Sequence, residues 1–329
     1  MLRMKRDTVR LWTKQQYPYP SAWGFIPKLD GYLHDDDVSR PAIIIAPGGG
    51  YRRCAPREGE CIAIRFFEMG YQAFVCTYTT NPLGIHPLLS QPAKDIAQAV
   101  RYLRRNADAL RVMPDRIILC GFSAGAHAAG TAGVHWVDFA APDDEAVSAC
   151  RPDALLLCYP VVSIFSEISH GISSRNLLGV HPTEEMIRYM QLEKNVGPDC
   201  PPVFLWHTVT DRTVSVENSR VFADACRKAG VPCELHLFSS GDHGLSLADG
   251  SITINDANMY TFEQTACVLD ALERGMLKLS PEMEQQYLAY PEVKLLRSHG
   301  KSAGTAAVNE EVSNWAVLAQ HWLCRLWGR

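Results

Sequence analysis

Short runs of apolar residues, bounded by glycine, proline or polar positions, recur along the chain. They predict strands at 42–46, 71–78, 116–120, 154–158, 203–206 and 233–238. Apolar residues occupy consecutive positions in most of these runs, as is typical of strands that are buried on both faces of a sheet. Because stretches of helical periodicity separate the runs, the sequence predicts an α/β fold, a mostly parallel central sheet with helices on both faces.

Three helices are predicted from apolar residues that repeat every three or four positions, at 90–110, 215–229 and 315–326. Ser90 and Pro92 suit the start of the first helix. Gly230 is expected to end the second, because glycine accepts the left-handed backbone that often follows a helix. The third helix carries a stripe of tryptophan and leucine side chains, so it must lie against another apolar surface.

The region 249–311 interrupts this alternation because it contains no strand-like run. Helices are expected at 259–277 and 280–290, and Ser280 is placed to cap the second of them. The stretch 298–307 is small and polar, which is typical of a mobile loop.

We therefore expect residues 1–329 to form one catalytic domain that holds a helical insertion at about 249–311 and is closed by a helix at 313–327. The insertion carries leucines that must pack on something. Three roles stay open for it: a lid over the site, a subunit contact in a homo-oligomer, or a passive decoration on the flank of the domain.

Composition and charge exclude several classes of protein. Lys+Arg is 32 and Asp+Glu is 36, a formal net charge of −4 that lacks the basic footprint of a nucleic-acid-binding protein. The longest clean apolar stretch, 154–162, is too short to span a membrane, and residues 1–8 lack the apolar segment of a secretory signal. The 11 cysteines show neither a C-x-x-C pair nor zinc-ligand spacing. We therefore expect a soluble, cytoplasmic protein with reduced thiols, no metal, and no membrane or nucleic-acid partner.

The segment Gly121–Gly125 is a G-x-S-x-G sequence centred on Ser123. An apolar strand precedes it and an alanine-rich helical stretch follows, which is the context that a nucleophile elbow requires. Ser123 is therefore the candidate nucleophile, and a glycine–serine turn without chemistry is the alternative.

A second glycine-rich segment, Pro47–Tyr51, follows the predicted strand at 42–46. Glycine lets backbone N–H groups approach a ligand closely, so Gly49 and Gly50, together with the amide of Ala124, are candidates for an oxyanion hole. The alternatives are a plain loop and a phosphate cradle. A phosphate cradle of the Walker type needs a Gly-Lys-Ser/Thr sequence, which is absent.

Eleven histidines compete for the role of general base. His243 is preferred because it lies in a turn-rich segment, Gly241–Gly244, just past the predicted strand at 233–238. His127 follows Ser123 by only four residues and is expected to face the core or neighbouring loops. His207 ends a strand and is interpreted as a supporting residue.

An acid is needed to hold the base and to stabilise its charged form. Asp211 is the candidate because it follows the strand at 203–206 and precedes a helix. A capping role is its structural alternative. Asp242 adjoins His243 and is poorly placed to reach its Nδ1, and Glu217 is held in reserve.

These motifs together resemble the bacterial acetylesterase group that includes acetylxylan-esterase-like enzymes, within the α/β-hydrolase superfamily. The matching segments are Pro47–Tyr51, Arg57–Glu60, Gly121–Gly125, Phe204–Thr208 with Asp211, Val216–Ser219 and Gly241–Gly244. The resemblance implies an α/β-hydrolase fold with its residues in the order Ser, Asp, His, no cofactor, and acetylated sugars as substrates.

Two features of the chain depart from the pattern of the group. Ala126 stands where the group usually has a second glycine after the elbow, and the insertion at 249–311 is larger than expected. Glu58 and Glu60 belong to the matching pattern either because they orient the glycine loop or because they favour a helix start.

The leading hypothesis is a serine carboxylesterase that removes short acyl groups, acetyl above all, from acetylated xylo-oligosaccharides or related alcohols. A small-molecule or oligosaccharide ester is then the substrate. An amidase, formamidase or exopeptidase with the same three residues is the main alternative. A hydrolase fold reused as a ligand receptor is the other, although such proteins usually lose one of the three residues.

Overall fold

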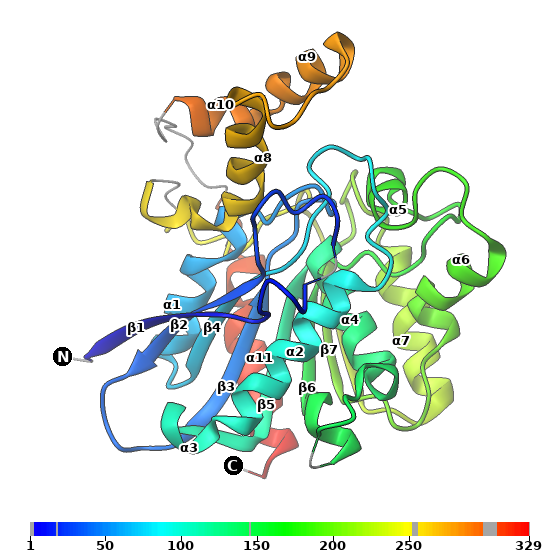
Figure 1. Cartoon of the computed structure of the whole chain (residues 1–329). Coiled ribbons are helices and arrows are strands. Elements are labelled where there is room, and N and C mark those ends of the chain that lie inside the picture. Colours follow the sequence, from blue (N-terminus) through cyan, green and yellow to red (C-terminus); the bar gives the residue numbers. More distant parts are fainter. Residues whose placement is uncertain (1–2, 18, 145, 252–255, 299–307, 329) are drawn as a thin grey trace.

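An eight-stranded sheet forms the centre of the molecule (Figure 1). The computed structural model describes residues 3–17, 19–144, 146–251, 256–298 and 308–328. The strands are β1 (Met4–Arg10), β2 (Lys28–His34), β3 (Arg40–Ala46), β4 (Gln72–Thr77), β5 (Val112–Phe122), β6 (Ala154–Cys158), β7 (Val203–Thr208) and β8 (Cys233–Phe238). Their spatial order is β1-β2-β4-β3-β5-β6-β7-β8. Strands β3 to β8 run parallel to one another, and β2 pairs antiparallel with both β1 and β4.

Helices cover both faces of the sheet (Figure 1). The α-helices of the described residues are α1 (Glu60–Glu68), α2 (Gln91–Arg105), α3 (Ala107–Leu110), α4 (Ala124–Val134), α5 (Gly171–Leu178), α6 (Glu184–Met190), α7 (Glu217–Ala229), α8 (Glu263–Glu273), α9 (Pro281–Ala289), α10 (Pro291–Arg297) and α11 (Trp315–Leu326). Alternate residues of a strand point to opposite faces. Ile44 accordingly belongs to the apolar cluster that includes residues of α2, α4 and α7, whereas Ile43 and Ile45 belong to the cluster that includes residues of α1 and α11.

The six predicted strands are confirmed with small changes in their bounds, and so are the helices at 215–229 and 315–326. The predicted helix at 90–110 is wrong in its continuity. Helix α2 ends at Arg105, Asn106 leaves the helical conformation, and α3 is a separate four-residue helix. A short helix that the sequence analysis did not identify, α1, follows the glycine-rich segment.

Helices α8, α9 and α10 form the described part of the insertion and stand at the top of the view in Figure 1. The two ends of the insertion lie side by side, because an antiparallel bridge joins Asp249 to Val308. The prediction of a helix over 259–277 is wrong at both ends: a 3-10 helix covers Asp256–Phe262, and α8 is shorter. The predicted helix at 280–290 is confirmed as α9, where the Ser280 hydroxyl accepts a hydrogen bond from the backbone amide of Met283 at 3.3 Å.

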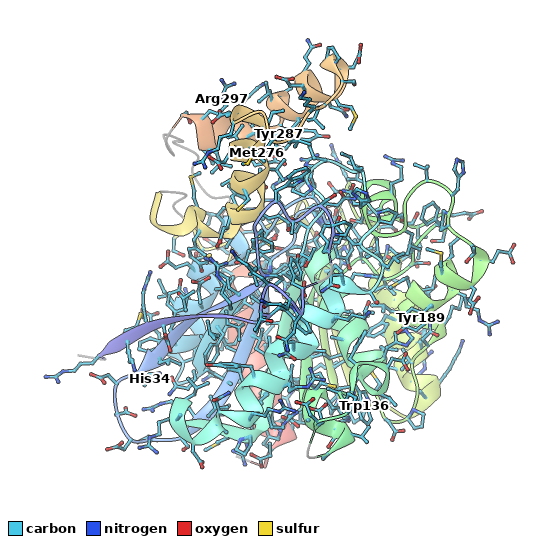
Figure 2. The ribbon with its side chains drawn as sticks, in the orientation of Figure 1. His34, Trp136, Tyr189, Met276, Tyr287 and Arg297 are labelled. Atoms are coloured by element: carbon cyan, nitrogen blue, oxygen red, sulfur yellow. The ribbon has the colours of Figure 1, made fainter. Side chains whose placement is uncertain are left out.

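The insertion has a small apolar core of its own, built from side chains such as Val268, Leu269, Tyr287 and Val293 (Tyr287 is labelled in Figure 2). Residues 299–307 of the predicted mobile loop lie outside the described residues. A homo-oligomer formed through the insertion stays a prediction.

Within the described ranges, the helices are too short or too polar to cross a membrane. All 11 cysteines are free thiols.

Helix α11 anchors the back of the sheet through Trp315, which is completely buried. Its indole ring stacks on Trp206 at 5.6 Å and meets Phe122 edge-on at 5.8 Å, and Nε1 donates to the backbone carbonyl of Ser246 at 2.8 Å. We expect Trp315→Ala to lower the free energy of unfolding by about 3–5 kcal/mol, because a large cavity would remain next to the sheet. Denaturant melts should show a much smaller loss for Trp327→Ala, a half-buried tryptophan in the same C-terminal segment. Equal losses in the two variants would contradict this packing account.

Candidate active site

Ser123 lies in the sharp turn between β5 and α4. Its backbone adopts φ 52° and ψ −119°, a strained conformation for a residue with a side chain. A Cβ on Gly125 would lie 2.2 Å from the carbonyl oxygen of Ala46, so only glycine lets the turn approach the end of β3 this closely. This geometry presents the Ser123 hydroxyl at the carboxyl end of the sheet, where ligands of open α/β sheets bind.

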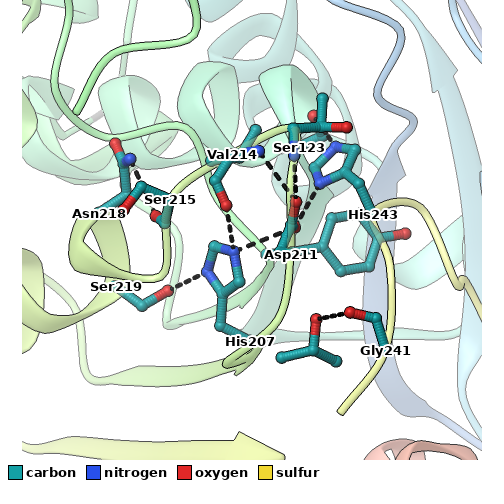
Figure 3. Close-up of polar contacts among 12 residues, drawn as sticks. Ser123, His207, Asp211, Val214, Ser215, Asn218, Ser219, Gly241 and His243 are labelled. Carbon is teal, nitrogen blue, oxygen red and sulfur yellow. Dashed lines mark hydrogen bonds and ion pairs between the residues drawn. The ribbon is translucent and has the colours of Figure 1, made fainter. Parts of the chain in front are cut away.

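Three of the candidate residues, Ser123, His243 and Asp211, form one chain of hydrogen bonds (Figure 3). His243 Nε2 lies 2.8 Å from Ser123 Oγ, and His243 Nδ1 lies 2.6 Å from Asp211 Oδ2. The loops that follow β7 and β8 supply Asp211 and His243, so residues 120 positions apart along the chain meet at the elbow. The arrangement allows the imidazole to take a proton from the hydroxyl while its other nitrogen stays bound to the carboxylate.

The Asp211 carboxylate is fully buried and satisfied on both oxygens. Its Oδ1 accepts the backbone amides of Thr213 and Val214 at 2.8 and 2.9 Å, and its Oδ2 lies 3.2 Å from His207 Nε2. Burial alone raises the pKa of this carboxyl, but the hydrogen bonds from His207 and His243 outweigh it and hold the pKa well below its ordinary value. Asp211 therefore carries its negative charge at neutral pH.

His207 supports Asp211 from beneath, as the sequence analysis predicted. The ring is buried, and its Nδ1 is bound to the Ser219 hydroxyl at 2.8 Å, which leaves Nε2 to face the carboxylate (Figure 3).

The other candidates lie elsewhere. His127 is held in the core between the Tyr51 hydroxyl at 2.6 Å and the backbone carbonyl of Met190 at 2.8 Å, and burial lowers its pKa to about 4. Asp242 accepts the backbone amide of His243, and Glu217 pairs with Arg220. His127, Asp242 and Glu217 are therefore engaged in contacts outside the Ser123–His243–Asp211 chain.

Gly49 and Gly50 line a cavity of about 250 Å³ together with Ser123 and His243. Both glycines have positive φ angles, 130° and 64°, and a Cβ on Gly49 would lie 2.2 Å from the carbonyl oxygen of Arg53. Ala124 is the first residue of α4, and the backbone amides in the first turn of a helix have no intrahelical acceptor. In the described part of the chain, the amides of Gly49, Gly50 and Ala124 have no hydrogen-bond partner, so they are available to a ligand.

Sequence comparison adds independent evidence. The BD-FAE family model matches residues 29–226, more than half of the sequence. The chain belongs to the BD-FAE family. Among solved structures, this BD-FAE member is similar to an acetyl ester-xyloside bifunctional hydrolase from Caldicellulosiruptor lactoaceticus, with 34% identity and a TM-score of 0.69 over 83% of this chain and 97% of that one. It is also similar to MGS-M1, an α/β-hydrolase from a deep-sea metagenome library, with 25% identity and a TM-score of 0.60 over 98% and 97% of the two chains.

Two curated relatives are longer proteins. Endo-1,4-β-xylanase B of Butyrivibrio fibrisolvens is 40% identical over 264 residues, which are 80% of this chain and 41% of the xylanase. The acetylxylan esterase of Xylanibacter ruminicola is 29% identical over 214 residues, 64% of this chain and 42% of the esterase. The chain thus spans about two fifths of the length of these relatives. Together with the solved structures, they confirm the predicted α/β-hydrolase fold and the resemblance to acetylesterases.

Glu58 of this BD-FAE member orients the glycine loop, which was one of the two roles left open for it. Its carboxylate is buried, and Oε2 accepts the backbone amide of Gly48 at 2.8 Å. Oε1 accepts the Tyr159 hydroxyl at 2.7 Å, and the Tyr159 ring packs edge-on against His243 at 5.0 Å. Glu60, by contrast, begins α1 and pairs with Arg6. Glu58 therefore connects the glycine loop, through Tyr159, to His243.

The sequence analysis missed Tyr159 and Asn176, whose side-chain amide donates to the Gly50 carbonyl at 2.8 Å. Tyr159 directly follows β6, so the rule that selected Asp211, a polar residue at the carboxyl end of a strand, would have found it. No such signal marks Asn176, which lies within α5. Among the residues described here, no group of three or more His, Cys, Asp or Glu side chains is placed to hold a metal ion.

Proposed function

We propose that this BD-FAE member is a serine carboxylesterase that removes short acyl groups, acetyl above all, from carbohydrate alcohols such as acetylated xylo-oligosaccharides. One observation carries the proposal: Ser123, His243 and Asp211 form a continuous hydrogen-bond chain at the edge of a cavity lined by the glycine loop. The named activities of the relatives, an acetylxylan esterase and an acetyl ester-xyloside hydrolase, support the substrate class.

The proposed reaction has two stages, formation and hydrolysis of an acyl-enzyme. The Ser123 oxygen attacks the acyl carbon while His243 takes the hydroxyl proton, and the charge that develops on the carbonyl oxygen is met by the amides of Gly49, Gly50 and Ala124. Collapse of the tetrahedral intermediate breaks the bond to the alcohol, which leaves with the proton from His243. Water then attacks the acyl-enzyme by the same route and releases the carboxylic acid and free Ser123.

An amide or peptide bond is the other substrate that this arrangement of residues can hydrolyse. The relatives and solved structures above whose names state a substrate are a xylanase, an acetylxylan esterase and an acetyl ester-xyloside hydrolase, so this alternative is not favoured. Rates on an acetyl ester and an acetyl amide of the same aryl group would separate the two. We expect the ester to be hydrolysed at least a hundredfold faster.

An acyl-length series tests the proposal directly. Aryl esters from acetate to octanoate, measured beside acetylated xylo-oligosaccharides, should give the highest kcat/KM for the acetate and release of acetate from the sugars. Absence of turnover on every ester, or a clear optimum at octanoate, would contradict the proposal.

Glu58→Ala should lower kcat for aryl acetate by roughly a hundredfold, because a small displacement of the glycine loop misplaces the oxyanion donors. It should also lower the free energy of unfolding by about 1–3 kcal/mol, since the amide of Gly48 and the hydroxyl of Tyr159 lose their acceptor. The matched control is Glu60→Ala, whose carboxylate contacts Arg6 instead of the loop. If Glu60→Ala lowers kcat as much as Glu58→Ala, Glu58 has no special link to the oxyanion loop.

A further inference from the structure

A second cavity, of about 460 Å³, adjoins the one that contains Ser123. Arg53, Ala55 and Arg57 line both cavities, so the two share a wall. The far side of the second cavity comes from the insertion, through residues of α10 and through Phe262. The second cavity therefore lies between the Ser123 cavity and α10.

The wall formed by α10 contains an unusual carboxylate. Glu292 is buried, with 2% of its side chain exposed, and its Oε1 pairs with Arg52 Nε at 2.7 Å and with Arg53 Nη1 at 3.4 Å. Its Oε2 is also buried, yet it has no hydrogen-bond partner among the described residues. A buried carboxylate oxygen without a donor is costly, so a ligand hydroxyl that reached Oε2 from the cavity lined by Glu292 would remove that cost.

The other lining groups complement that acceptor. Arg57 and Lys294 are exposed cations whose charged groups have no hydrogen-bond or ion-pair partner within the described part of the chain, so they offer donors. Phe262 and Pro291 add apolar surface. A sugar ring matches this combination, because its hydroxyls both donate and accept hydrogen bonds and its C–H face is apolar. A simple anion could pair with the cations, but it has no hydroxyl to donate to Glu292 Oε2 and no apolar face for Phe262 and Pro291.

Arg57 also connects this cavity to the base. Its guanidinium fills the space beside Gly244, where a Cβ would lie 2.2 Å from Nη2, and Gly244 directly follows His243. A group held by Arg57 is thus next to the segment that carries the base.

We propose that the second cavity is a subsite for the glycosyl unit that adjoins the acetylated unit of an oligosaccharide, and that Glu292 Oε2 accepts a hydrogen bond from one of its hydroxyls. The proposal rests on the esterase function proposed above, and it gives the insertion a role in substrate binding. The acetylated unit lies over Ser123, and its neighbour extends toward α10.

Three substrates test this subsite: an aryl acetate, an acetylated methyl xyloside, and an acetylated xylotriose. The readout is the ratio of kcat/KM for the trisaccharide to kcat/KM for the monosaccharide. We expect the wild-type ratio to be about tenfold or more, as for the gain of one hydrogen bond to a charged group. Glu292→Gln retains the shape of the side chain but can place an NH₂ group at the vacant position, and it should bring the ratio close to one.

Leu295→Trp is the second variant, because Leu295 lines the cavity without contacting the arginine pairs of Glu292. It should also abolish the preference by filling the space. Glu284→Gln, in α9 and away from this cavity, is the matched control and should retain the wild-type ratio.

The outcomes separate the two proposals. A wild-type ratio near one, or a ratio that neither variant changes, would overturn the subsite while turnover of aryl acetate upholds the esterase. Equal losses on all three substrates in Glu292→Gln would assign Glu292 to positioning Arg52 and Arg53, which follow the glycine loop, and would also overturn the subsite. No acetate release from any substrate by the wild type would overturn the esterase function itself.

Discussion

Replacing Ser123 with alanine is expected to lower kcat for aryl acetate by roughly a millionfold, the loss seen when a serine nucleophile is removed from an arrangement of this kind. The reason is geometric. His243 Nε2 lies 2.8 Å from Ser123 Oγ, so removing the hydroxyl takes away both the attacking atom and the proton that the imidazole accepts. Binding of the substrate should change little, because the glycine loop and both cavities keep their shape.

Initial rates at saturating substrate measure this effect, and the melting temperature shows that the variant is folded. Ser313→Ala is a suitable control, since that hydroxyl only donates to the backbone carbonyl of Glu310. A Ser123→Ala variant that is folded and retains about one per cent or more of the wild-type kcat would rule out Ser123 as the nucleophile.

Asp211→Asn carries the second largest expected effect, a loss of about 10⁴-fold in kcat. The carboxylate accepts the Nδ1 proton of His243 at 2.6 Å and so fixes the tautomer in which Nε2 is free to accept the proton of Ser123. An asparagine amide can present its NH₂ group to Nδ1, which favours the opposite tautomer. Asp242→Asn is the matched control because, among the described residues, the hydrogen-bond partner of its carboxylate is the backbone amide of His243. Equal losses in the two variants would remove the argument for Asp211.

The low pKa of Asp211 adds a pH dependence to this comparison. Its pKa in the folded protein lies below the ordinary aspartate value of 3.8, so the stability it contributes is complete above that value and disappears as the pH falls below it. The difference in melting temperature between wild type and Asp211→Asn should therefore be largest near about pH 6 and shrink below about pH 4. A difference that stays constant across this range would show that the charge of Asp211 does not stabilise the fold.

The parallel part of the sheet was predictable because its strands are apolar at consecutive positions, as in Ile43–Ile45. The edge was not. Strand β1 is exposed at nearly every residue, so neither continuous hydrophobicity nor alternation marks it. The break at Asn106 was missed because Ala107 and Leu110 continue the helical spacing of α2 even though the backbone does not.

The candidate site also has a part that could be predicted from the sequence and a part that could not. Ser123, Asp211 and His243 each follow a predictable strand, so the topology of a parallel sheet brings them to one edge. The contacts that depend on the insertion had no such signal. Glu292 meets Arg52 across 240 positions of the chain, and only the folded insertion brings them together. The sequence therefore predicted which three residues come together at this edge of the sheet, but not which residues of the insertion line the neighbouring cavity.

Trapping the acyl-enzyme tests the central claim most directly. The wild-type protein is mixed with excess aryl acetate, quenched in acid within the first turnovers, digested and analysed by peptide mass spectrometry. The account predicts the mass of one acetyl group on the peptide that contains Ser123, increased in Asp211→Asn if deacylation slows more than acylation, and absent from Ser123→Ala. Acetylation at another residue that tracks turnover, or full turnover by Ser123→Ala, would contradict it.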